Sequence, residues 1–171
     1  MNRALFTVAW LPVLAGCGYH VSGHADLLPK NIKTIAVPPF GNATTRYQLA
    51  RLLPEDITRE FLSRTRYSVV SDPAKADAVL TGAILNAFAF PTTIDPVSAR
   101  ATGIQASVYL QLTLTDRGTG QVLWSRPSAQ FNERYEIAID PAQYFDESST
   151  AVIRLSQDVA REVVSGVLEK F

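Results

Sequence analysis

The sequence predicts an α+β domain, a two-layer sandwich in which two helices pack on one face of a small sheet. Residues 107–115 alternate apolar and polar side chains, which is typical of a strand with one buried face. Residues 47–65 and the C-terminal stretch repeat apolar side chains at spacings of three and four, as amphipathic helices do. The element order β-α-β-β-β-α favours a mostly antiparallel or mixed sheet of about four strands.

The N-terminal half begins with an expected strand at residues 32–37, which Pro38 and Pro39 end because proline cannot donate to a ladder. Residues 40–45 have the composition of a loop. The helix follows, and Pro54 within it either kinks it or, as we favour, begins its main part after one preceding turn. Its apolar stripe contains Leu49, Leu52, Leu53, Ile57 and Phe61.

The central region is expected to be extended. A short strand at Tyr67–Val70 precedes a long one at Asp77–Phe90, in which Gly82 suggests a bulge or bend. Residues 91–103 are expected to form a loop long enough to have a function.

The strand at residues 107–115 should have one core face and one polar face that meets water or a partner. Residues 116–120 form the expected hairpin turn to a returning strand at 121–125, which Pro127 interrupts before it continues over 130–139. Asp140 and Pro141 resemble the start of a helical turn. The final helix should begin near Asp146 and Glu147 and bury a stripe formed by Val152, Leu155, Val159, Val163, Val167 and Phe171.

The N-terminus has the pattern of a bacterial lipoprotein signal. Arg3 is followed by an apolar run that is too short to span a bilayer, and the run closes on Leu-Ala-Gly before Cys17, the only cysteine. We therefore expect residues 1–16 to be a signal peptide, 17–28 a lipidated tether and 29–171 a single domain. Cys17 would carry a covalent diacylglyceryl group and an N-acyl chain, which together anchor a protein stably.

The residue after the cysteine is Gly18, and aspartate at that position is the common signal for inner-membrane retention. The expected location is therefore the outer membrane, facing the periplasm of a Gram-negative-type bacterium. Removal of residues 1–16 would leave 155 residues with a net charge of −1, which gives no general attraction to nucleic acid.

Catalytic and metal sites are not expected. The two histidines, His20 and His24, lie in the tether, and lipidation of Cys17 would consume the thiol that could complete a zinc site with them. The sequence contains no nucleophile elbow, zinc-protease helix or phosphate-binding loop. We expect neither an enzyme nor a cofactor beyond the covalent lipid.

A binding or assembly role remains, and the candidate contacts lie in the second half of the chain. They are the polar face of residues 107–115, the 91–103 loop and five aromatic residues that could instead belong to the core. These aromatic residues are Phe88, Phe90, Trp124, Phe131 and Tyr135. The basic candidates, which could instead be solvated, are Arg100, Arg117, Arg126 and Arg134.

The chain resembles the LptE family of lipopolysaccharide-assembly lipoproteins over essentially its whole mature length. The resemblance lies in the Cys-Gly-Tyr-His start at 17–20, in residues 28–38 and 67–79, and in the order of the elements. It implies an outer-membrane plug and assembly partner of the β-barrel LptD, which moves lipopolysaccharide to the outer leaflet. It also implies that lipopolysaccharide is bound, and Arg100, Arg117 and Arg134 are our candidate contacts.

A second resemblance stays open. Residues 35–42 and 72–82 are also similar to small α/β domains of secretion channels, such as curli-export lipoproteins and the N-terminal domain of TolB. Such a protein would form homo-oligomeric rings, whereas an LptE protein would be present as one copy per barrel.

Overall fold

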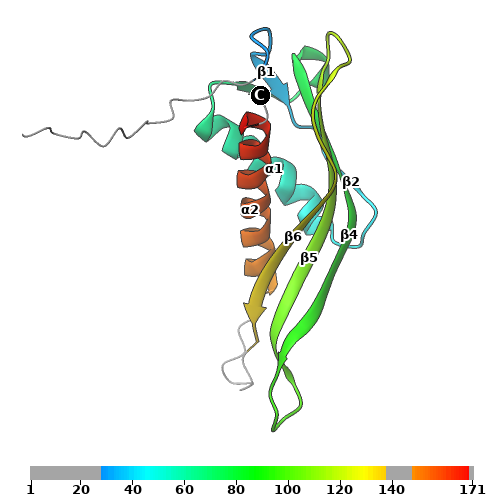
Figure 1. Cartoon of the computed structure of the whole chain (residues 1–171), viewed down its shortest axis with the longest axis vertical. Coiled ribbons are helices and arrows are strands. Elements are labelled where there is room, and N and C mark those ends of the chain that lie inside the picture. The colour runs from blue at the N-terminus through cyan, green and yellow to red at the C-terminus, as the bar shows by residue number, and fades with distance from the viewer. Residues whose placement is uncertain (1–27, 138–147, 170–171) are drawn as a thin grey trace, which may run out of the picture.

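A computed structural model describes residues 28–137 and 148–169. Both helices lie on the same side of one long, twisted sheet, whose strands β4, β5 and β6 extend beyond the helices at one end (Figure 1). The predicted class, an α+β fold with an open mixed sheet, is confirmed. The elements are β1 (Thr34–Ala36), β2 (Gly41–Asn42), α1 (Tyr47–Arg64), β3 (Ser68–Val70), the 3-10 helix η1 (Pro73–Lys75), β4 (Ala78–Ile94), β5 (Ala101–Asp116), β6 (Val122–Glu136) and α2 (Ser148–Glu169).

The described residues form a six-stranded sheet rather than the four strands expected. Its order is β3-β1-β4-β5-β6, and β2 pairs with β4 beside β1. The pairs that involve β1 or β2 are parallel, whereas β4, β5 and β6 form an antiparallel meander. The meander is therefore the long part of the sheet, and the short parallel strands support only one end of it.

The core lies between the sheet and the two helices. The alternation on β5 is confirmed, since Val108, Leu110, Leu112 and Leu114 are completely buried. From α1 the expected stripe contributes Leu49, Leu53, Ile57 and Phe61, while Leu52 is only half-buried. Helix α2 packs on α1 and on β6, and buries Leu155, Val159, Val163 and Val167 among others.

Helix α1 runs without interruption over Pro54 and ends one residue before the expected boundary. One polar bond joins it to α2 inside the core. The buried hydroxyl of Ser156 donates to Asp56 Oδ2 at 2.6 Å, and Arg59 donates to the other oxygen of the same carboxylate at 2.6 Å. Because a buried polar group must be paired, this bond favours one alignment of the two helices.

The expected loop at 91–103 is wrong, because most of it continues the hairpin. Pro91 pairs with Ile104, and only residues 95–100 turn the chain, where Asp95 accepts from the backbone N–H groups of Val97 and Ser98. The pairing of β4 with β2 ends at Ile84, so beyond that residue no strand among residues 28–137 and 148–169 pairs with this edge of β4. Proline is tolerated there because no ladder partner needs its missing N–H.

Two further expectations are corrected in the same region. Residues 40–45 are not only a loop, because Gly41 and Asn42 pair with Ala83 and Ile84. The register of β4 against β5 shifts between Ile84 and Asn86 and again between Pro91 and Ile94, rather than at Gly82. On β6 the expected irregularity at Pro127 is confirmed. Leu110 pairs with Ala129 and Leu112 pairs with Arg126, so the register shifts across Pro127.

Gly82 is required for a different reason. The ring of Phe40, which is buried, packs directly over it, and a Cβ at Gly82 would lie 2.6 Å from the ring. The aromatic ring occupies the space that a side chain on the strand would need.

We expect Gly82→Ala to lower the free energy of unfolding by about 1–3 kcal/mol, because the ring of Phe40 would be displaced from a packed core. Gly41→Ala is the matched control, since its Cβ would meet Ala83 at 3.5 Å, an ordinary contact, and its effect should be within about 0.5 kcal/mol. Urea unfolding followed by circular dichroism measures both. Equal losses in the two variants would contradict this account of Gly82.

Candidate functional site: a groove at the helix N-termini

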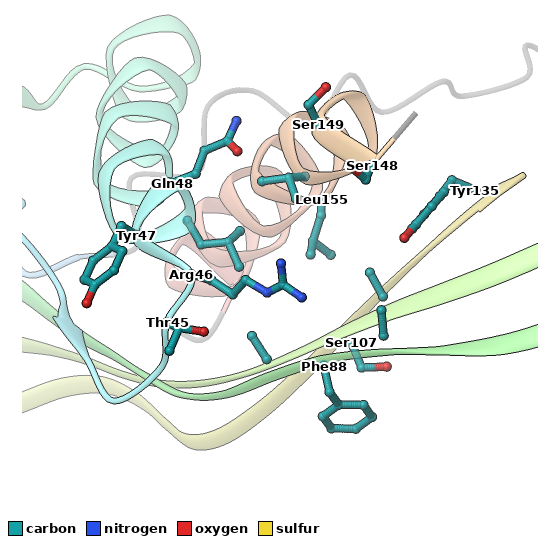
Figure 2. A pocket seen from close by; sticks show the side chains of 15 residues that line it. Thr45, Arg46, Tyr47, Gln48, Phe88, Ser107, Tyr135, Ser148, Ser149 and Leu155 are labelled. Carbon is teal, nitrogen blue, oxygen red and sulfur yellow. The ribbon is translucent and has the colours of Figure 1, made fainter. Parts of the chain in front are cut away.

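A groove of about 500 Å³ opens where α1 and α2 begin and the strands extend past them. Figure 2 shows its lining, with the helix starts on one side and the strands on the other. Its residues come from the start of α1, from β4, β5 and β6, and from the start of α2. They are Thr45, Arg46, Tyr47, Gln48, Leu49, Ala87, Phe88, Ala89, Ala106, Ser107, Tyr135, Ser148, Ser149, Val152 and Leu155.

The groove exists because the strands carry small side chains there. Ala87, Ala89 and Ala106 line it, while the side chains of Phe88 and Ser107 point away from the helices, so these two contribute mainly backbone (Figure 2). On the helix side the buried Leu49 and Leu155 continue the hydrophobic core into the groove. An apolar surface therefore remains open to solvent at this end of the domain.

Arg46, the residue before α1, carries the one charge on the described lining. Its guanidinium points into the space between the helices and the strands (Figure 2), and none of the ion pairs among the described residues includes it. The carboxylate of Glu133, which pairs in register with Ala106, accepts from Arg154 at 2.6 Å. Helix α1 has no acidic residue in its first turn and no side-chain cap, so the positive end of its dipole is not neutralised from within the helix.

The opposite face of the meander is exposed and has an aromatic centre. The rings of Phe88 and Tyr109 stack with centroids 6.0 Å apart, and Phe90 lies 6.0 Å from Phe88. Polar groups surround them, and the hydroxyl of Ser107 donates to Asn132 at 2.6 Å. We call this surface the outer face; it corresponds to the polar face expected from the sequence, with aromatic residues added.

The five aromatic candidates divide among three environments. Trp124 and Phe131 belong to the core, at 3% and 5% exposure, whereas Phe88 and Phe90 are each 40% exposed on the outer face. Tyr135 is half-buried and lines the groove.

The arginine candidates do not gather into one site. Arg100 and Arg134 belong to the end where the meander extends past the helices, Arg100 in the β4–β5 turn and Arg134 opposite Gln105. Arg117 follows the other end of β5. Arg126 pairs with Glu162 of α2 and lies over the ring of Trp124.

Arg117 has structural contacts. Its Nε donates to the carbonyl of Ala76 at 2.7 Å, and its backbone N–H donates to the carbonyl of Asp77 at 2.8 Å. The pKa of Asp77 is held below its ordinary value, chiefly by the backbone N–H of Lys33 and then by the hydroxyl and N–H of Thr34. Asp77 therefore stabilises the join of β1 and β4 at neutral pH, and this contribution is lost as the pH falls through its lowered pKa.

The N-terminal candidates Cys17, His20 and His24 lie outside the described residues, as do Asp140, Pro141, Asp146, Glu147 and Phe171. Within residues 28–137 and 148–169, no group of histidine, cysteine or acidic side chains has the arrangement of a metal site. In the same ranges neither helix has the length and hydropathy to cross a membrane.

The comparison with protein families gives one result. The model of the LptE family, described as lipopolysaccharide-assembly, matches residues 32–166. The match covers every strand and helix of the structure except the last three residues of α2. No curated protein sequence matches the chain.

Solved structures share the fold at low sequence identity. Uncharacterized lipoprotein B from Nitrosomonas europaea is 16% identical with a TM-score of 0.58, over 86% of this chain and 88% of its own. Protein CT253 from Chlamydia trachomatis is 13% identical with a TM-score of 0.55, over 80% and 96%. PelC from Paraburkholderia phytofirmans, solved as a dodecamer, is 15% identical with a TM-score of 0.51, over 80% and 89%.

Proposed function

Because this chain belongs to the LptE family of lipopolysaccharide-assembly lipoproteins, we propose that it is the plug and assembly partner of the barrel LptD. The family match over residues 32–166 carries this proposal. The role is non-catalytic: the protein occupies the barrel, promotes its assembly and contributes to the passage of lipopolysaccharide to the outer leaflet. The partners we propose are LptD and lipopolysaccharide, and no nucleic acid.

The shape and chemistry of the domain support a position inside a barrel. The outer face is a regular surface of three antiparallel strands with exposed amide, hydroxyl and aromatic groups. The interior of a large outer-membrane barrel is polar, so such a surface can contact it without a large desolvation cost. The sequence also has equal numbers of charges, 16 basic and 16 acidic residues. The protein is therefore not strongly repelled by a barrel interior of either positive or negative charge.

The proposed location is the outer membrane, facing the periplasm. The sequence supports it through the lipoprotein signal that ends at Cys17 and through Gly18, which is not the aspartate of inner-membrane retention. The tether between the lipid and Leu28 is short, about 35–40 Å when fully extended. The domain would therefore work beside the membrane surface, where the mouth of a barrel lies.

Copurification from detergent-solubilised outer membranes tests the proposal. We expect the tagged full-length protein to bring down one large β-barrel in a one-to-one complex, identified by mass spectrometry and sized by light scattering. A tagged outer-membrane lipoprotein of another family, purified in parallel, should not bring down this barrel. A homo-oligomeric ring without a barrel would contradict the proposal and would favour the secretion-channel alternative.

A further inference from the structure

We propose that the groove at the helix N-termini binds one acyl chain of a phosphorylated lipid, with Arg46 contacting the phosphate. The inference rests on the proposed function for the source of that lipid, which would be lipopolysaccharide. The site itself is argued from the geometry of the groove, which is separate from Arg100, Arg117 and Arg134.

The apolar half of the site suits an acyl chain. Its volume of about 500 Å³ lies within the range of about 300–1,000 Å³ that is usual for small-ligand sites. Its floor and walls are aliphatic, formed by Leu49, Leu155 and Val152 on the helices and by the alanines of β4 and β5. An acyl chain in the groove would be transferred from water to contact with apolar side chains of both the helices and the strands. Such a transfer of methylene groups has a favourable free energy.

The polar half of the site suits a phosphate. Arg46 extends its guanidinium over the apolar walls, and this planar group donates to a phosphate through two parallel hydrogen bonds. The start of α1 borders the groove and has no side-chain cap, so its backbone N–H groups and dipole favour an anion beside Arg46. A cation beside an apolar slot is the arrangement that a charged amphiphile requires.

Charge complementarity therefore separates this occupant from a second protein surface. Arg46 is the one charged residue on the described lining, and the nearby Glu133 is already paired with Arg154. A protein segment would need both an apolar side chain and a carboxylate at one point. A phosphorylated acyl lipid carries both groups in one molecule, so we commit to it as the occupant.

Photo-crosslinking in living cells tests this with the full chain in its membrane. The photoreactive residue p-benzoylphenylalanine is placed at Ala89, which is exposed and lines the groove, and in a second strain at Asn86, which is exposed and pairs with Tyr109 of the outer face. We expect the Ala89 position to yield an adduct with lipopolysaccharide, identified by mass spectrometry, and the Asn86 position to yield much less.

The role of Arg46 is tested in the same assay. We expect Arg46→Gln to lower the lipid adduct at position 89 by about tenfold, the effect of losing one charge-assisted contact. Arg46→Lys should keep much of the adduct because it keeps the charge. Arg161→Gln, which changes an exposed arginine of α2 outside the groove, should leave the adduct unchanged. Arg46 is exposed, so these variants should fold, and equal resistance to added protease confirms that.

Three outcomes would overturn the inference. They are an adduct at position 89 with protein alone, an adduct with the lipid attached to Cys17 of the same chain, and a lipid adduct that Arg46→Gln does not reduce. Failure of the proposed function is recognised separately, because it appears as loss of the barrel from the copurification. A protein that binds its barrel but yields no lipid adduct at position 89 would refute the groove alone.

Discussion

Phe61→Ala is expected to lower the free energy of unfolding by about 3–5 kcal/mol, the cost of emptying a large buried aromatic site. Phe61 lies at the end of the apolar stripe of α1, is completely buried and is the largest of the fully buried side chains. A domain of this kind is stable by only about 5–15 kcal/mol, so the variant would be close to unfolding at growth temperature. Urea unfolding of the purified protein, followed by circular dichroism, gives the difference.

The next residue along the chain provides the control. Leu62 has a side chain of similar hydrophobicity on the same helix but is 58% exposed. Leu62→Ala should change the free energy of unfolding by no more than about 0.5 kcal/mol. If the two variants lost the same stability, the burial of Phe61 would not be the cause.

Cys17→Ser is expected to remove the protein from the outer membrane, because serine cannot form the thioether that carries the diacylglyceryl group. Each methylene of a buried chain contributes about 0.8 kcal/mol, and one chain alone anchors a protein only weakly. Loss of all chains therefore changes the membrane partition by a larger free energy than any core substitution. Intact-mass measurement of the fractionated protein should show the acyl groups on the wild type only.

His20→Ser is the matched control, since it changes a neighbouring tether residue and leaves the thiol. It should keep the acyl mass and the outer-membrane location. A wild-type protein found in the soluble fraction, or one that retains residues 1–16 with a free thiol, would refute the lipid anchor.

The parts of the fold that follow from local periodicity were predictable. The alternation of β5 and the three-and-four spacing of α1 and α2 each reflect a single apolar face, and each face is buried as expected. The missed features depend on distant partners. The pairing of Gly41 and Asn42 is decided by β4, and Pro91 stays in its strand because no described strand pairs with that edge of β4.

The groove could not be derived from any one segment. Arg46, Ala89 and Val152 come together only through the packing of α1, β4 and α2, and none of them lies in a motif. One local signal was present: residues 87–90 read Ala-Phe-Ala-Phe, with small side chains on one face of a strand and aromatic ones on the other. That pattern indicates a strand that is open toward the helices and bulky on its outer face.

The chain order has a consequence for the export of the protein. Helix α2 closes the core against α1 and β6, yet it follows all the other described elements in the chain. In a polypeptide that is exported from its N-terminus this helix follows the meander, so the apolar side of the meander has no cover until α2 has also been delivered. During that interval the exposed apolar face is the part of the domain most prone to aggregate.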